Sequence, residues 1–418
     1  MSTNIQKNQI TEGIIWRQLL LFFFPILLGT FFQQLYNTID SVIVGQFVGK
    51  EALAAVGGSS AQIVAFVVGF FTGLSSGASV TIAQFFGAKD SRSANKGLHT
   101  AYAIAAFGGL ILTVSGIILT PFLLEMMNTP ADIVADSAVY LRIYFAGIIF
   151  VLIYNMGSAI LRATGDSKRP LYYLIVCCII NIVLDVLFVI VFHMGVMGVA
   201  VATLIAQAVS AVLVTLKLMR SEGILKLSVK QIRFHGSILK MQLKLGLPTG
   251  FEAILFSITN IAIQSAVNTF GTDTTAAWSA YGKLDAIFWM VSTAFGIAIT
   301  TFVGQNYGAG KMDRVRKSTR VCLLMDFIVS AVLVVFLIAA RFLLFRLFTN
   351  DSHVIEIGCD MLVLITPWYI VYVFIEVIAG ALRGVGNVVV PVAITLLGVC
   401  VLRIAWLAAM LKISPTIS

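Results

Sequence analysis

The stretch ALAAVGGSSAQIVAFVVGFFTGLSSGASVTIAQFFGA, residues 52–88, contains no charged side chain. A membrane-spanning helix requires about 20 predominantly apolar residues, so this stretch is long enough to cross a bilayer. Further uncharged runs of spanning length lie at residues 97–124, 186–216 and 286–310. The chain has 418 residues, of which 59% are hydrophobic and 11% are charged, whereas soluble domains are typically about 25% charged. The sequence therefore predicts an all-α membrane protein with many spans, and these long runs exclude the alternating strands of a β-barrel.

The apolar runs predict eleven spans, six before the most charged segment of the chain and five after it. That segment, residues 221–240, is interpreted as a cytoplasmic linker with an amphipathic piece at the membrane surface. It separates an N-terminal lobe at residues 1–220 from a C-terminal lobe at residues 241–418. The predicted spans are 14–46, 52–83, 97–121, 133–160, 169–192, 195–219, 238–269, 275–305, 320–348, 354–381 and 387–411.

The lysines and arginines are unevenly divided between the two sides of the predicted membrane. Most of the 28 lie in the N-terminal segment and in the loops that fall on the same side as it. Cytoplasmic loops carry an excess of Lys and Arg, so the N-terminus is expected in the cytoplasm, with the protein in a bacterial inner membrane. The net charge of +9 reflects this bias and does not indicate binding to nucleic acid. The five cysteines lack metal-binding spacing and are expected to be small buried residues.

The two halves of the chain resemble each other in sequence. LRATGDSKRP at residues 161–170 aligns with LRGVGNVVVP at 382–391, and AQFFGAK at 83–89 aligns with GQNYGAG at 304–310. Equivalent spans are six apart, so the repeats are predicted to be parallel, with an axis along the membrane normal and the substrate path between them. The second half has five spans where the repeat predicts six. The natural gene is therefore expected to continue for one further span.

Three glycines in the second predicted span, Gly69, Gly73 and Gly77, follow the pattern G-x3-G-x3-G. Small residues at this spacing let two helix backbones approach closely, so the pattern indicates a packing surface. A surface on which helices slide during transport is the alternative interpretation.

Polar residues interrupt the first predicted span, which contains FFQQLYNTID at residues 31–40. On a helix, Gln33, Asn37 and Asp40 lie at i, i+4 and i+7 and form one polar stripe. A charged residue in mid-membrane costs at least about 2.5–3.5 kcal/mol, so such residues usually face a bundle interior and mark an ion or substrate path. The alternative is that Asp40 only hydrogen-bonds a neighbouring helix.

Other predicted spans carry polar residues as well. The fifth contains Asn181 and Asp185 at i and i+4, the sixth contains Thr203 and Gln207 at the same spacing, and the fourth contains Asn155. Carboxylate, amide and hydroxyl oxygens suit a proton or a small hard cation. These residues therefore predict an ion site.

The repeat allows an internal comparison of these residues. If they were scaffold contacts, the second half should need them too, but three of four are replaced there by apolar residues. The fourth becomes Glu376, which with Glu252 is expected to be the main buried carboxylate of the second half. This difference favours an ion site in the first half. The corresponding pairs are Asp40 and Ile263, Asn181 and Leu402, Asp185 and Trp406, and Asn155 and Glu376.

Several motifs resemble those of the multidrug and toxic compound extrusion (MATE) transporters, and look closest to the DinF-type branch. They are the spacing from Pro25 to Asp40, VGQFVGKEALAAVG at 44–57, AQFFGAKD at 83–90 and ALRGVGN at 381–387. The resemblance covers essentially the whole chain. It implies two lobes of six helices around a central cleft, which export organic cations or related amphiphiles in exchange for H⁺ or Na⁺. The chain departs from this pattern in lacking the twelfth helix.

The resemblance also implies roles for individual residues. In DinF-type members the coupling residues are an Asp in the first helix, an Asn and an Asp four apart in the fifth, and a Thr in the sixth. The matching positions here are Asp40, Asn181, Asp185 and Thr203, with Asn155 nearby, and the first four are candidate Na⁺ ligands. Glu252 is a weak equivalent of a seventh-helix Glu of another branch. The expected cleft residues, including aromatic ones that can stack on cations, are Gln33, Tyr36, Asn37, Tyr154, Gln207, Glu252, Tyr281, Trp289 and Glu376.

Three other functions are weighed against a drug exporter. A flippase for lipid-linked saccharides should line its cleft with basic residues to hold pyrophosphate, whereas the charges within these spans are mainly acidic. An enzyme is not supported, since HExxH and GxSxG motifs are absent. A passive channel fits less well than an ion-coupled carrier. The expected partners are membrane lipid and small cationic substrates for a monomeric protein, with no cofactor besides the coupling ion.

Overall fold

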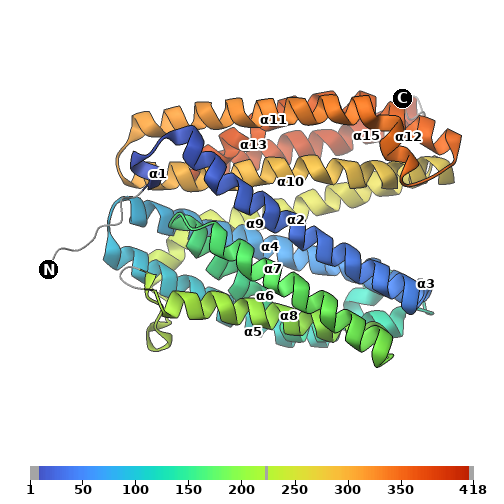
Figure 1. Cartoon of the computed structure of the whole chain (residues 1–418), viewed down its shortest axis with the longest axis horizontal. Coiled ribbons are helices and arrows are strands. Elements are labelled where there is room, and N and C mark those ends of the chain that lie inside the picture. Colours follow the sequence, from blue (N-terminus) through green and yellow to red (C-terminus); the bar gives the residue numbers. More distant parts are fainter. Residues whose placement is uncertain (1–8, 222–224, 414–418) are drawn as a thin grey trace. The chain divides into compact units, whose positions relative to one another are not determined.

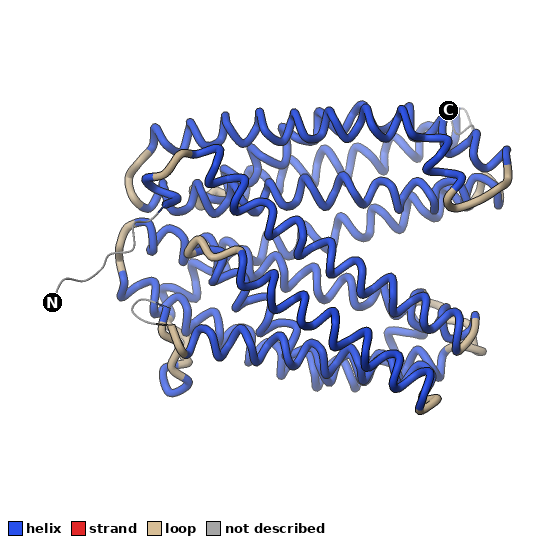
Figure 2. Tube along the Cα trace, in the orientation of Figure 1, coloured by secondary structure: helices blue, strands red, loops and turns tan. Residues whose placement is uncertain are grey.

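The computed structural model describes residues 9–221 and 225–413, in which every regular element is a helix (Figures 1 and 2). Within these residues 11 helical segments are long and apolar enough to cross a membrane. This number confirms the predicted all-α fold with eleven spans. The segments are Ile15–Phe47, Lys50–Gly87, Ser91–Met126, Val134–Ala163, Lys168–Val191, Gly195–Met219, Gly236–Asn268, Thr272–Gly308, Met312–Arg346, Ser352–Gly384 and Val389–Ala409.

The chain forms two compact units. The first, here called the N-terminal unit, comprises Phe24–Ala253. It contains the later part of α2 (Ile15–Phe47) and the first part of α9 (Gly236–Asn268). Its other helices are α3 (Lys50–Gly57), α4 (Ser59–Gly87), α5 (Ser91–Met126), α6 (Val134–Ala163), α7 (Lys168–Asp185), the π-helix η1 (Val186–Val191), α8 (Gly195–Met219) and the short 3₁₀ helix η3 (Val229–Gln231).

The second compact unit, here called the C-terminal unit, contains the described residues before Phe24 and after Ala253. The eleventh span of the chain, like the fifth, contains a π-helix. The tenth span of the chain is broken by a 3₁₀ turn at Pro367, where proline lacks the backbone N–H of a helix interior. The helices are α1 (Gln9–Glu12), α10 (Thr272–Gly308), α11 (Met312–Arg346), α12 (Ser352–Ile365), η4 (Thr366–Trp368), α13 (Tyr369–Gly384), α14 (Val389–Ile394), η5 (Thr395–Val401) and α15 (Leu402–Ile413).

The turn after α6 and the turn after α13 have the same backbone conformation. Gly165 has φ of 99° and Gly386, 221 residues later, has φ of 91°. Each donates its N–H to the carbonyl of an arginine three residues earlier, Arg162 or Arg383, at 2.9 Å. Residues other than glycine rarely adopt this φ, which explains why the glycine recurs in the repeated motif.

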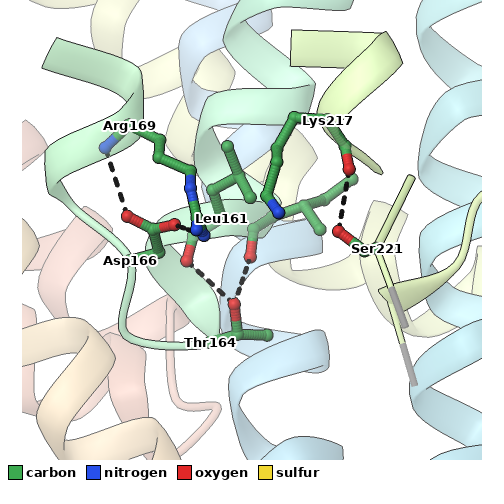
Figure 3. A network of polar contacts seen from close by, with 7 residues as sticks. Leu161, Thr164, Asp166, Arg169, Lys217 and Ser221 are labelled. Carbon is green, nitrogen blue, oxygen red and sulfur yellow. Dashed lines mark hydrogen bonds and ion pairs between the residues drawn. The ribbon is translucent and has the colours of Figure 1, made fainter. Parts of the chain in front are cut away.

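Side chains reinforce these two turns in the same way. In the first, Asp166 Oδ1 accepts the N–H of Arg169 at 3.1 Å, and its Oδ2 lies 2.5 Å from the Arg169 guanidinium (Figure 3). In the second, Asn387 Oδ1 accepts the N–H of Val390 at 3.3 Å. An aspartate and an asparagine can therefore occupy the same position, because both supply the acceptor oxygen that starts the next helix.

One hydrogen bond between helices also occurs in both halves. Ser79 Oγ on α4 donates to the carbonyl of Ala159 on α6 at 3.2 Å. At positions 221 residues later, Thr300 Oγ1 on α10 donates to the carbonyl of Gly380 on α13 at 3.0 Å. The internal repeat is thus a repeat of interhelical contacts as well as of sequence.

The glycines of α4 form a close-packed contact with α9 inside the N-terminal unit. A Cβ atom on Gly73 would lie 2.4 Å from the backbone nitrogen of Gly250, and one on Gly77 would lie 2.4 Å from that of Gly246. No side chain fits at these distances, so the backbones touch directly. The packing role predicted for the G-x3-G-x3-G pattern is confirmed.

The linker is attached to the start of α5 by two histidines. His99, which is 1% exposed, has Nδ1 2.8 Å from the carbonyl of Asn95 and accepts the N–H of Ser228 on Nε2 at 3.0 Å. The N–H of His235 donates to Thr100 Oγ1 at 3.3 Å. The linker therefore folds back onto α5 at these two histidines. Residues 222–224 of the linker lie outside the described residues.

Candidate functional site

Three helices of the N-terminal unit bring four polar side chains together in a buried cluster, here called the Asp40 cluster. Asp40 lies on α2, Asn181 and Asp185 lie one turn apart on α7, and Thr203 lies on α8. All four are buried, and Asp185 is 0% exposed. The carboxylate of Asp40 interacts with the side chains of the other three. The structure thus assembles four residues that the sequence places up to 163 positions apart.

The polar atoms of the Asp40 cluster are largely unsatisfied. Oδ1 of Asp40, both carboxylate oxygens of Asp185, the amide of Asn181 and the hydroxyl of Thr203 are buried without a hydrogen-bond partner among the described residues. A buried polar group without a partner costs about 1–3 kcal/mol, and more when it is charged. Two facing carboxylates also repel each other when both are ionised. The cluster is therefore suited to hold a positive charge.

The chemistry of these atoms decides which positive charge fits. Carboxylate, amide and hydroxyl oxygens are hard ligands, which suit H⁺ or a small cation such as Na⁺. Within the residues that the structure describes, no group of three or more His, Cys, Asp or Glu side chains is placed to hold a metal ion. The donors of the Asp40 cluster are two carboxylates with two neutral groups, a set that suits a proton or a small hard cation.

Two residues predicted to line the cleft lie beside this cluster and are buried. Gln207 on α8 donates through Nε2 to the hydroxyl of Tyr36 at 3.3 Å, and Tyr36 lies one helical turn before Asp40 on α2.

Asn155 on α6 is half-buried and is not among the side chains that interact with Asp40. Tyr154 is buried and donates its hydroxyl to the carbonyl of Pro170 at 3.0 Å, which is a contact between the ends of α6 and α7.

The predicted polar stripe of the first span divides in the structure. Gln33 and Asn37 are exposed, whereas Tyr36 and Asp40 are buried. The helical angle places Gln33 close to Asp40, but the two residues lie about two turns apart along the axis. Whether a residue of α2 is buried depends on which other helices of the unit lie beside α2 at that height. The angular position of the residue on α2 does not give this information. Gln33 and Asn37 therefore lie outside the Asp40 cluster.

Two tyrosines that the sequence did not single out lie next to the cluster. Tyr140 and Tyr144 on α6 are stacked, with ring centroids 6.2 Å apart. Tyr140 is within electrostatic range of both Asp40 and Asp185. The spacing YLRIY at residues 140–144 places both rings on one face of a helix, and this signal could have identified them.

The C-terminal unit contains a second polar cluster, here called the Asp285 cluster. Trp289 donates its indole N–H to Asp285 at 2.8 Å, and the hydroxyl of Tyr369 makes a short hydrogen bond to the same carboxylate. The hydroxyls of Tyr281 and Tyr369 are 2.6 Å apart, and the ring of Phe288 stacks on Tyr369 at 4.0 Å. Two predicted cleft residues, Tyr281 and Trp289, thus meet at an aspartate that sequence reasoning missed.

Glu376 on α13 is half-buried and paired. Its Oε1 lies 3.6 Å from the guanidinium of Arg383, and its Oε2 accepts the hydroxyl of Tyr372 at 3.4 Å. The expectation that Glu376 and Glu252 are the main buried carboxylates of the second half is wrong, because Asp326 on α11 is 0% exposed. Asp326 has no acidic counterpart in the first half, so the repeat did not point to it. Glu252 is half-buried on α9 within the N-terminal unit.

A membrane protein of two similar halves, with buried oxygen ligands on its spans, has the architecture of a secondary transporter. The family MatE matches the chain twice, at residues 25–187 and 248–407. The chain belongs to this family, whose members are transporters and not enzymes. The two matches also confirm the internal repeat predicted from the sequence.

Individual relatives are similar over most of their length. "Probable multidrug resistance protein YoeA" of Bacillus subtilis is 30% identical over 393 residues, covering 92% of this chain and 84% of the relative. "Probable multidrug resistance protein NorM" of Thermotoga maritima is 27% identical over 420 residues, covering 98% and 88%. A solved structure, the outward-facing conformation of a multidrug resistance MATE family transporter of the MOP superfamily, has a TM-score of 0.87 at 22% identity, covering 94% and 88%. This likeness confirms the MATE fold.

Proposed function

We propose that the chain is a secondary active multidrug exporter, which exchanges amphiphilic organic cations for H⁺ or Na⁺ by alternating access. The observation that carries this proposal is the Asp40 cluster, whose two carboxylates face each other with unsatisfied oxygens. Relatives named as multidrug resistance proteins support the substrate class. Within the family, we assign the chain to the DinF-type branch on the residues Asp40, Asn181, Asp185 and Thr203.

The coupling ion binds between Asp40 and Asp185, with Asn181 and Thr203 as neutral oxygen ligands and Asn155 nearby. One positive charge there removes the repulsion between the two carboxylates and satisfies oxygens that otherwise have no partner. A single charge moving through 100 mV releases about 2.3 kcal/mol, which is enough to drive roughly tenfold or greater coupling. Pro25, inside α2, lacks the N–H of a helical hydrogen bond and permits α2 to bend when the ion binds.

The Asp285 cluster recognises the cationic group of the substrate. Its carboxylate supplies the negative charge, and the rings of Trp289 and Tyr369 supply aromatic faces, which attract organic cations, while the fully buried Phe288 supports the ring of Tyr369. Gln33, Asn37, Glu252 and Glu376 are further candidates for contact with substrate. The N-terminus lies in the cytoplasm, as the distribution of Lys and Arg indicates, and the protein acts as a monomer.

Transport by the purified protein in liposomes tests the proposal. Vesicles with equal ethidium, a lipophilic cation, inside and outside receive an imposed proton gradient, an imposed sodium gradient or neither. We expect ethidium movement against its own gradient with one of the two ions, and no such movement in protein-free vesicles. Transport that ignores both gradients would contradict ion coupling. Movement of fluorescent lipid-linked saccharide in place of ethidium would indicate a flippase.

A further inference from the structure

Asp326 is a buried carboxylate that the Asp40 and Asp285 clusters do not include. It lies in the middle of α11 and is 0% exposed. Ser330, one turn later, donates its hydroxyl to Oδ1 at 3.1 Å, whereas Oδ2 is buried without a hydrogen-bond partner among the described residues. An ionised carboxylate is strongly disfavoured within a membrane unless its charge is compensated. The structure therefore requires a compensating charge or a proton at this position.

A charged neighbour of Asp326 comes from α13. The carboxylate of Glu376 is the charged neighbour of Asp326, so the two residues repel each other when both are ionised. Glu376 is already paired with the guanidinium of Arg383, at 3.6 Å. Two carboxylates and one guanidinium leave one negative charge uncompensated. One proton on Asp326 makes the group neutral and lets its hydroxyl donate a hydrogen bond.

Gly296 on α10 leaves space for the carboxylate of Glu376. A Cβ atom on Gly296 would lie 2.1 Å from Oε1 of Glu376, so only glycine allows the carboxylate to occupy its place. The corresponding position in the first half is Ser75, whose hydroxyl donates to the carbonyl of Phe71 on the same helix. The close approach of Glu376 is thus a specific feature of the C-terminal unit.

The repeat shows that the shared helix arrangement does not need this acidic pair. The positions that correspond to Asp326 and Glu376 are Ala105 and Asn155, both uncharged, while Arg383 corresponds to another arginine, Arg162. The N-terminal unit builds the same turn after the fourth span without the carboxylates. An acidic pair within the spans that the fold can omit indicates a functional role.

We propose that Asp326 is a proton-binding site of the C-terminal unit, separate from the Asp40 cluster and held in its protonated form by the Glu376–Arg383 ion pair. The ligand is a proton and not a metal cation, because Asp326 offers a single free oxygen whereas hard cations bind several oxygen ligands. The absence of metal-ligand groups among the described residues agrees with this. The site gives the transporter a second titratable group that can exchange a proton when the ion pair opens.

Infrared difference spectroscopy of the purified protein tests this proposal without requiring transport. A protonated carboxylic acid in an apolar site has a carbonyl stretching band that ionised carboxylates lack. In wild-type-minus-variant difference spectra at neutral pH, we expect Asp326→Asn to remove one component of this band, here called the Asp326 component. That component should persist in Asp40→Asn, and in Asp360→Asn, which removes an exposed aspartate of the same unit.

Glu376→Gln provides a second, independent readout. It removes the negative charge that repels an ionised Asp326, so Asp326 ionises more readily and the Asp326 component should weaken or disappear although Asp326 is intact. An Asp326→Asn difference spectrum with no lost component, loss of the same component in Asp40→Asn, or an unchanged component in Glu376→Gln would overturn the proposal. None of these results depends on whether the protein exports drugs, so a failure here is distinguishable from a failure of the proposed function.

Discussion

Replacing Asp40 by Asn removes one of the two carboxylates that face each other in the N-terminal unit while keeping the size of the side chain. In the structure, Asp40 interacts with Asp185, Asn181 and Thr203, and its Oδ1 has no hydrogen-bond partner among the described residues. An ion that satisfies this oxygen gains about 1–3 kcal/mol from it. The variant should therefore bind the coupling ion about 5–150-fold more weakly.

This loss can be measured as stabilisation of the purified protein by the ion. At a free ion concentration 100 times Kd, binding stabilises the wild-type protein by about 2.7 kcal/mol. If Kd rises about 100-fold in Asp40→Asn, the same concentration equals Kd and the gain falls to about 0.4 kcal/mol. Thermal unfolding with and without Na⁺, repeated over a range of pH, reports this gain for Na⁺ and for H⁺.

A matched control is available on the same helix. Thr38 is exposed, and its hydroxyl bonds only the carbonyl of Gln34 within α2, at 2.8 Å, so Thr38→Ala should keep the full ion-dependent stabilisation. If Asp40→Asn, correctly folded, were stabilised by Na⁺ and by acid as much as Thr38→Ala, the assignment of the ion to the Asp40 cluster would be refuted.

Three further predictions concern other parts of the molecule. Gly73→Ala places a Cβ 2.4 Å from the backbone of Gly250 and should lower stability by about 1–3 kcal/mol in thermal unfolding, whereas Gly29→Ala, with nothing within 4 Å, should not. Asp285→Asn should raise the ethidium concentration for half-maximal transport about tenfold or more, since a charged contact contributes about 1.5–3 kcal/mol, while ion-dependent stabilisation stays at the wild-type level; equal ethidium dependence would contradict the role of the Asp285 cluster. Burial and nearby positive charges lower the pKa of His235, so the attached linker binds fewer protons than the free linker and its attachment should weaken as pH falls below about 6.5. The protection of linker amides against hydrogen exchange, measured relative to the intrinsic exchange rate at each pH, should fall on acidification, and unchanged protection would show that His235 does not control the attachment.

The residues of the proposed ion site were predictable from the sequence, whereas other buried acidic residues were not. Asn181 and Asp185 were predictable as a pair, since a spacing of four fixes one helix face, and Asp40 stood out as a charge within a span. Asp285 and Asp326 are also charges within spans, and each bonds a side chain four positions later on its own helix, but neither has an acidic counterpart in the repeat. Their surroundings, Tyr369 for Asp285 and Glu376 for Asp326, come from another helix. Such partners depend on packing, which local patterns do not contain.

The sequence by itself determined the class of the protein: an all-α membrane protein with eleven spans and an internal repeat. These are local properties, because the length of an apolar run sets a span and a glycine with positive φ sets a turn. Only the tertiary structure decided that Asp40 and Tyr36 are buried while Gln33 and Asn37 are exposed, and that His99 holds the linker. Those outcomes depend on which helices lie next to each other at a given level, and residues over a hundred positions apart supply the neighbours.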